Sequence, residues 1–216
     1  MKNPVIYTSV YGSYDSISPV PESSKYRYVC VTDEPDMAKK AGWEVIYRKA
    51  TEPISVRNAR FVKIHPHLYL DDHDVSLWVD GNLTLLKDPE PVLTHCLKDF
   101  DMAMFDHYFL NDLVSELREC IRCRKDDPET MTNQVKAYLE DGFPQLAYNH
   151  FMTMFIARRH NEPSVVKAMD KWWYELKNNS YRDQLSFSYA CWKTGLRCNR
   201  INAKHTDFFN TRLHLK

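Results

Sequence analysis

Asp80, Gly81 and Asn82 form the segment of this chain whose residue types and spacing best suit chemistry. They follow residues 75–79 (Val-Ser-Leu-Trp-Val), an apolar run that predicts a buried strand. Because alternate residues of an extended chain share a face, Asp80 and Asn82 would present two oxygens on one side. Gly81 would let a ligand approach the backbone closely. Such oxygens suit a hard divalent cation, Mn²⁺ or Mg²⁺, which can hold a diphosphate; the alternative is an ordinary turn.

A second set of charged residues lies upstream of this strand. Arg57, Arg60 and Lys63 are spaced by three within residues 55–70, where the apolar residues follow a helical period. Residues three apart share a face of a helix, so we expect the three cations to point the same way. Beside a diphosphate they would stabilise negative charge, with arginine able to make bidentate contacts. The alternative is a basic face exposed to solvent. Pro66 should end or kink this helix.

Strand and helix patterns alternate along the chain, which predicts an α/β fold with a mostly parallel, mixed central sheet flanked by helices. We expect strands at residues 5–10, 26–31, 43–47, 75–79, 101–105 and 151–157, a last strand or an extended tail at 200–205, and helices at 55–70, 89–97, 111–123, 131–141, 163–176 and 183–192. Asn111 and either Thr130 or Thr132 are the expected N-caps of two of these helices. Because no internal repeat or Gly/Ser linker interrupts the pattern, residues 1–216 are expected to form a single domain.

Polar residues follow the strands, at the edge where open α/β sheets bind ligands. Residues 11–15 follow the first strand, Asp33 the second, Asp80 the fourth and residues 106–107 (Asp-His) the fifth. The chain has neither a Gly-x-Gly-x-x-Gly segment nor a Gly-Lys-Ser/Thr segment, which argues against ordinary dinucleotide and P-loop sites.

Composition narrows the function classes. The 29 Lys and Arg residues equal the 29 Asp and Glu residues, which argues against a general nucleic-acid binder. No apolar run is long enough to cross a bilayer, and the first residues lack a signal-peptide core, so we expect a soluble, cytoplasmic protein. Cys120 and Cys123 form a lone Cys-x-x-Cys without a second pair, and we interpret the six cysteines as reduced packing or surface thiols.

Several segments, in order, resemble a glycosyltransferase-like domain family with members in bacteria, large viruses and plant Golgi proteins linked to mucilage polysaccharide synthesis. The matching segments are residues 6–15, 28–33, 42–45, 57–60, 63–67, 77–82, 157–161 and 182–187. They span nearly the whole chain, and their combination is more specific than any one of them. The family is of GT-A type and distantly similar to retaining galactosyl- and glucosyltransferases that use UDP-sugars and manganese.

The resemblance implies a metal-dependent glycosyltransferase that moves a sugar from a nucleotide-sugar donor, UDP-linked, to a glycan or another hydroxyl acceptor. Asp80 would be the main protein ligand of the metal. Asn82 would bind the metal through water or hold a sugar hydroxyl. His205, expected after a terminal strand, would be the second metal ligand, with His214 as the fallback.

Further roles follow from the same resemblance. Thr8 would contact the nucleotide through its backbone and hydroxyl, Tyr11 by stacking, and Asp33 by accepting a hydrogen bond from the base or ribose. A core or turn role is the alternative for Thr8 and Tyr11. Asp183 would be the general base of an inverting enzyme, whereas in a retaining enzyme Asp183 or Gln184 would hold sugar hydroxyls. A plain N-cap is the alternative for Asp183.

The identity of the acceptor cannot be inferred from the family resemblance. Residues 106–109 (Asp-His-Tyr-Phe) stand where relatives tend to carry His followed by Pro and Arg, and many relatives have Glu near residues 148–150. His107, Asn149 and His150 are the candidate groups on the acceptor side. Two other functions stay open: a nucleotide- or carbohydrate-binding module with weak or no catalysis, and a metal-dependent nucleotidyltransferase or phosphate-ester hydrolase built on the same aspartate.

Overall fold

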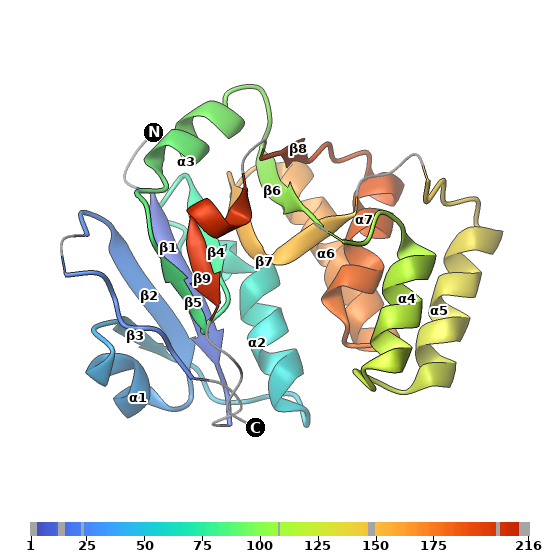
Figure 1. Ribbon diagram of the computed structural model, residues 1–216. Helices are drawn as coiled ribbons and strands as arrows, with labels where there is room; N and C mark the ends of the chain where they lie inside the picture. The colour runs from blue at the N-terminus through green and yellow to red at the C-terminus, as the bar shows by residue number, and fades with distance from the viewer. Residues whose placement is uncertain are drawn as a thin grey trace.

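A seven-stranded sheet in the order β3-β2-β1-β4-β7-β6-β8 forms the centre of the molecule (Figure 1). The computed structural model describes residues 4–12, 16–22, 24–107, 109–146, 150–201 and 204–211. The strands are β1 (Val5–Val10), β2 (Arg27–Thr32), β3 (Glu44–Tyr47), β4 (Ser76–Val79), β6 (Met102–Asp106), β7 (Phe151–Arg158) and β8 (Asn199–Arg200). Within this seven-stranded sheet the strand pairs are parallel except those that β7 makes with β4 and β6, so the expected mostly parallel mixed sheet is confirmed.

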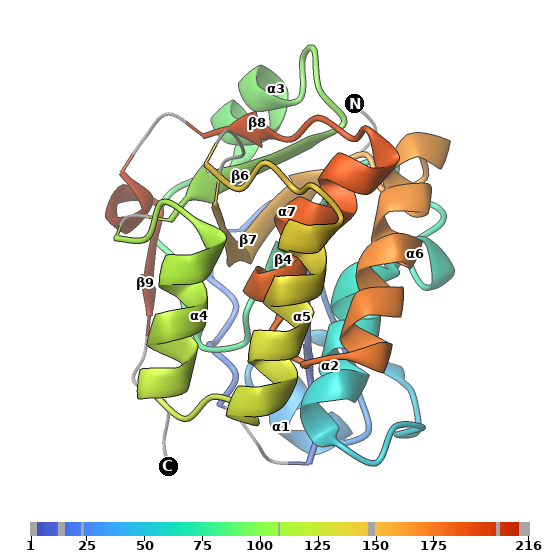
Figure 2. The ribbon, with the colours of Figure 1, turned by 90° about the vertical axis from the view of Figure 1, so that its right-hand side faces the viewer.

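Helices cover both faces of this sheet. On one face lie α2 (Ser55–Ile64), α6 (Pro163–Asn178) and α7 (Asp183–Thr194), which share a core with the sheet. On the other face lie α1 (Pro35–Lys40), α3 (Glu90–Cys96) and a two-stranded sheet of β5 (Leu83–Leu85) and β9 (Phe209–Thr211). Figure 2 shows α4 (Leu113–Arg122) and α5 (Pro128–Glu140) side by side in front of α7, with which they form a third core.

Most element boundaries agree with the sequence pattern, with differences at the ends. The helix expected over residues 55–70 stops at Ile64, and Pro66 opens a separate 3₁₀ turn, Pro66–Leu68. Of the two alternatives for residues 200–205, the strand is wrong: β8 ends at Arg200, and His205 opens another 3₁₀ turn, His205–Asp207. Within the described residues, no helix combines the length and apolar character that crossing a membrane requires.

Candidate functional site

Asp80 lies directly beyond the carboxyl end of β4. Its backbone N–H donates to the Met154 carbonyl at 3.0 Å, and its own carbonyl accepts from Leu83 N–H at 2.9 Å. The chain therefore turns at residues 80–83, and the expectation that Asp80 and Asn82 share a face of an extended strand is wrong. Asn82, within this turn, is buried, with 6% of its surface exposed.

Gly81 is required here by packing within the protein. A Cβ atom at this position would lie 3.0 Å from Val10 Cγ2 and 3.2 Å from the Ser16 carbonyl oxygen. The Gly81 carbonyl also accepts from Ser18 N–H at 2.7 Å. The close approach that the sequence predicted at Gly81 is thus made by the chain itself, which fixes the turn against β1.

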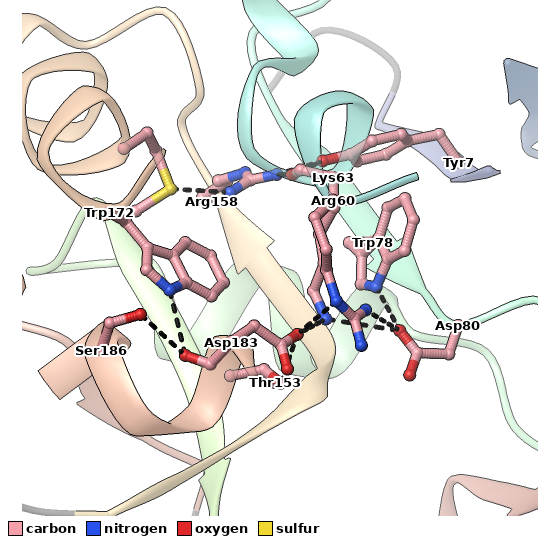
Figure 3. A network of polar contacts seen from close by, with 11 residues as sticks. Tyr7, Arg60, Lys63, Trp78, Asp80, Thr153, Arg158, Trp172, Asp183 and Ser186 are labelled. Carbon is pink, nitrogen blue, oxygen red and sulfur yellow. Dashed lines mark hydrogen bonds and ion pairs between the residues drawn. The ribbon is translucent and has the colours of Figure 1, made fainter. Parts of the chain in front are cut away.

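Two cations of α2 lie between two carboxylates (Figure 3). Lys63 Nζ is 2.6 Å from Asp183 Oδ2 and 3.4 Å from Asp80 Oδ1. Arg60 Nε is 3.2 Å from Asp183 Oδ2, an ion pair without hydrogen-bond geometry, and Arg60 Nη1 is 3.9 Å from Asp80 Oδ1. The Lys63 side chain is fully buried, and that of Arg60 is 16% exposed. A solvated basic face is therefore excluded for these two residues.

Arg57 does not join them. Its Nη2 donates to the Asn179 carbonyl at 3.1 Å, at the end of α6. Its Nε is buried and has no hydrogen-bond partner among the described residues. Of the three cations expected on one face, two meet the carboxylates, and the third joins α2 to the residues that precede α7.

Asp183 is the first residue of α7, and its side chain is buried. Its Oδ2 accepts from Lys63 and from Thr153 Oγ1, the latter at 2.9 Å, and its carbonyl accepts from Trp172 Nε1 at 3.0 Å. Burial opposes ionisation, but Arg60, Lys63 and Arg182 outweigh it and hold the pKa of Asp183 well below its usual range. The plain N-cap alternative is wrong, because the carboxylate points at Lys63 and Arg182 is the residue at the N-cap position. The neighbouring Gln184 is half-buried at the same helix end.

Lys63 is the buried cation that pairs with Asp183, and its pKa is shifted as well. Burial and the like charge of Arg60 lower the pKa of the Lys63 ammonium, whereas Asp183 and Asp80 oppose that shift. The ammonium also lies 5.4 Å from the centre of the Trp78 ring. Trp78 Nε1 donates to Asp80 Oδ1 at 2.7 Å, so the strand residue before the turn also orients the Asp80 carboxylate.

Two of the three candidate nucleotide contacts have buried polar atoms without a partner. Thr8 Oγ1 and Asp33 Oδ1, near the carboxyl ends of β1 and β2, make no hydrogen bond within the described residues. Because buried polar atoms are normally paired, both atoms could pair with a ligand. Asp33 is half-buried, whereas Thr8 is fully buried, so a ligand would reach the Thr8 hydroxyl only if neighbouring residues moved. Tyr11 is only 1% exposed, packs in the core and receives Arg48 Nη1 at 3.3 Å on its hydroxyl. In this structure its ring has no face open to a base.

His205 lies on the 3₁₀ turn that precedes β9. Phe209 pairs with Leu85 and Thr211 with Leu83, so β9 runs toward the Asp80 turn after leaving His205. The His205 ring contacts Phe209 at a centroid distance of 5.7 Å. The fallback His214 and the acceptor-side candidate Asn149 lie outside the described residues.

The fit to a divalent cation can be tested at Asp80. All of its ion pairs and its hydrogen bond to Trp78 use Oδ1, and Figure 3 shows Oδ2 pointing away from them. The side chain is 29% exposed, so Oδ2 can accept a hard cation while Oδ1 keeps its partners. In the part of the chain that the structure describes, no three His, Cys, Asp or Glu side chains form a metal cluster. Asp80 thus fits as one ligand of a site completed by other groups.

Sequence reasoning missed Glu116 of α4. Its carboxylate is buried beside His150, with Oε2 of Glu116 3.2 Å from Nε2 of His150. The signal was present in the sequence: Glu116 lies on the apolar stripe of an amphipathic helix, between Leu113 and Cys120. A charged residue in such a stripe is buried at a cost and needs a partner.

The expected acceptor-side residues His107 and His150 do lie together, with ring centroids 5.4 Å apart.

Comparisons with known proteins agree on family and fold. The family model of the TOD1/MUCI70 glycosyltransferase-like domain matches residues 6–211. The chain is 25% identical over 221 residues to the probable hexosyltransferase MUCI70 of Arabidopsis thaliana, covering 90% of this chain and 38% of that protein. The chain thus spans well under half of the length of this relative.

Solved structures of similar fold include the apo form of mouse xyloside xylosyltransferase 1. That structure has a TM-score of 0.55 at 8% identity and covers 92% of this chain and 85% of its own. A second is the galactosyltransferase LgtC in complex with donor and acceptor sugar analogs, with a TM-score of 0.50 at 11% identity, covering 85% and 69%. These likenesses confirm the GT-A fold that the family resemblance implied.

Proposed function

The chain belongs to the TOD1/MUCI70 family of glycosyltransferase-like domains, and we propose from this premise that it transfers a sugar from a UDP-linked donor to a hydroxyl group of a glycan. The observation that carries the proposal is the meeting of Asp80, Asp183, Arg60 and Lys63 at the strand edge. The proposal treats residues 1–216 as one catalytic domain.

Arg60 and Lys63 would stabilise the leaving diphosphate. Sugar transfer breaks the bond between the anomeric carbon and the diphosphate, and negative charge grows on the departing oxygen. Preorganised cations in a poorly hydrated site stabilise such charge strongly. Both side chains are already held in place by Asp183, so they need little rearrangement when the donor binds. A divalent cation held by Asp80, with Asn82 nearby, would neutralise the phosphates further.

Asp183 is better suited to holding sugar hydroxyls than to removing a proton. A general base works best when its pKa lies near the working pH, whereas Arg60 and Lys63 hold the pKa of this carboxyl far lower. Of the two roles that the sequence left open, we therefore propose the binding role, with Gln184 beside it. Such an arrangement favours a retaining enzyme.

The nucleoside would lie over the ends of β1 and β2. The unpaired Thr8 Oγ1 and Asp33 Oδ1 supply acceptors for ribose or base. Thr8 Oγ1 also lies beside the turn that bears Asp80, since a Cβ atom added at Gly81 would be 3.8 Å from it. This arrangement would place the diphosphate between the nucleoside and the Arg60–Lys63 pair.

Release of UDP from a panel of UDP-sugars, with and without Mn²⁺, tests the proposal. We expect the wild-type protein to release UDP from at least one donor and Asp80→Asn to lower this rate about 100-fold. The matched control is Asp74→Asn, because Asp74 is an exposed aspartate just before β4. Equal rates for the two variants would overturn the role of Asp80. Thermal stabilisation by UDP without any release would favour the binding module, and release of pyrophosphate from nucleoside triphosphates would favour the nucleotidyltransferase.

A further inference from the structure

Glu116 is a buried carboxylate that has no role in the sugar transfer proposed above. Only 3% of its surface is exposed. Oε2 lies 3.2 Å from His150 Nε2, and Oε1 accepts from Cys120 Sγ at 3.2 Å. Burial opposes its ionisation, but His150, Cys120 and Arg182 outweigh it, and the pKa of Glu116 is lowered. The protein therefore keeps a charged group on the buried face of α4, where an apolar residue would pack at a lower cost in free energy.

This carboxylate lies at the same edge of the sheet as Asp80. β7 runs antiparallel to both β4 and β6, so β4 and β6 point the same way and His107 follows β6 at the edge where Asp80 follows β4. His150 immediately precedes β7 and accepts the His107 backbone N–H on its carbonyl at 2.8 Å. Glu116, His150 and His107 thus form one cluster beside the site.

Arg182 joins the cluster to Asp183. Burial opposes its charge, but Asp183, Cys120 and Glu116 outweigh that effect and raise the pKa of Arg182. The guanidinium is therefore within electrostatic reach of the carboxylates on α7 and α4.

His107 and Phe109, which follow β6, have the chemistry of a saccharide contact. His107 Nδ1 accepts from Leu110 N–H at 3.0 Å and from Phe109 N–H at 3.3 Å, so the neutral ring carries its proton on Nε2. Phe109 is 75% exposed. An aromatic ring offers an apolar surface on which the C–H face of a sugar can pack, and an imidazole supplies polar contacts to hydroxyls.

We propose that Glu116 is a positioning residue for a neutral saccharide acceptor, holding His150 and, through it, His107, whose ring accepts from the Phe109 and Leu110 N–H groups. The carboxylate accepts the Nε2–H of His150 and so fixes the tautomer and orientation of that ring, as second-layer carboxylates do for functional histidines. The His150 carbonyl and ring then support His107. This inference rests on the proposed glycosyl transfer.

The test separates the KM of the acceptor from the KM of the donor. With the p-nitrophenyl glycoside that the wild type uses best, Glu116→Ala should raise the acceptor KM about tenfold and leave the donor KM within about twofold. Glu116→Gln, which can still accept from His150, should restore most of the acceptor affinity. The control is Glu119→Ala, because Glu119 lies on the exposed side of the same helix and pairs with Arg122; it should change neither KM.

A double-mutant cycle tests the pathway through His150. If Glu116 acts through that ring, Glu116→Ala should add little to the effect of His150→Ala on the acceptor KM. Additive effects, an unchanged acceptor KM in Glu116→Ala, or equal rises in both KM values would overturn the inference while UDP release by the wild type persists. No UDP release by the wild type from any donor would instead overturn the proposed function, and this inference with it.

Discussion

Among single residues, the buried pair of Lys63 and Asp183 carries the largest energetic consequence. Removing one partner of a buried ion pair leaves an uncompensated charge and costs about 3 kcal/mol or more. We therefore expect Lys63→Met to lower the free energy of unfolding by about 3 kcal/mol, because Asp183 keeps its hydrogen bond from Thr153 but, as an ion pair, only the longer contact to Arg60. Urea denaturation measures this change.

The control for that measurement is Lys136→Met on the exposed face of α5, where Lys136 pairs loosely with Glu140 at 3.7 Å. This substitution should leave the free energy of unfolding nearly unchanged. If Lys63→Met is as stable as the control, the buried pair makes no contribution, and the charge balance described for the site is incorrect.

The Asp183 carboxylate predicts that the stability of the protein depends on pH. Its pKa in the folded protein is below that of the unfolded chain, so the unfolded chain binds more protons as the pH falls. The stability that the charged Asp183 supplies is therefore present above about pH 4 and is lost as the pH falls further. The stability difference between wild type and Asp183→Asn should be largest near neutral pH and shrink below about pH 4. A difference that stays constant from neutral pH down to about pH 2.5 would contradict this cause.

Among the elements, α4 offers a test of local structure. Its N-cap is Asp112, whose side chain accepts from Ser115 N–H at 2.9 Å, and the cap expected at Asn111 is wrong. Asp112→Ala should cost about 1 kcal/mol of stability by thermal or urea unfolding, because the helix end loses its hydrogen-bond acceptor. Asn111→Ala, one residue away, should cost much less. Equal losses at the two positions would show that the cap does not stabilise this helix.

Strands were predictable because burial on both faces of a sheet produces continuous apolar runs. All six residues of β1 (Val5–Val10) are buried, and its predicted limits are confirmed.

Helix caps were less predictable than strands. Suitable side chains occur at several neighbouring positions, and only the fold selects among them: Asn111, Asp112, Asp127 and Thr130. The observed cap of α5 is Asp127, not Thr130 or Thr132. The short strand β9 was not anticipated, because three residues show too little periodicity.

Across the whole molecule, the site combines residues that lie far apart in the chain. Asp80, Arg60, Lys63 and Asp183 could be proposed from local patterns and the family resemblance, but their meeting could not, since Lys63 and Asp183 are 120 residues apart. The sequence pattern predicts only that Trp78 and Thr153 lie in strands. The structure shows that Trp78 contacts the carboxylate of Asp80 and that Thr153 contacts the carboxylate of Asp183. Tyr11 shows the reverse case, a residue with suitable chemistry that the fold uses as core.

The sheet arrangement explains why these residues meet. Parallel strands β1, β2 and β4 end at one edge (Figure 1). Helix α2 packs on the same face of the sheet as α6 and α7, with Arg60 and Lys63 directed toward Asp80 and Asp183 (Figure 3). Antiparallel β7 brings Thr153 beside α7 and Asp183. The donor-binding and acceptor-binding parts of the proposed site are therefore set by strand direction, the first over β1, β2 and β4 and the second over β6 and β7.

A crystal structure of the protein with UDP and Mn²⁺ tests the central claim most directly. We predict that the diphosphate lies between Asp80 and the Arg60–Lys63 pair, with manganese bound to the Asp80 carboxylate and the nucleoside near Thr8 and Asp33. UDP bound at another surface, with Asp80 still facing solvent and no metal beside it, would contradict the proposed donor site.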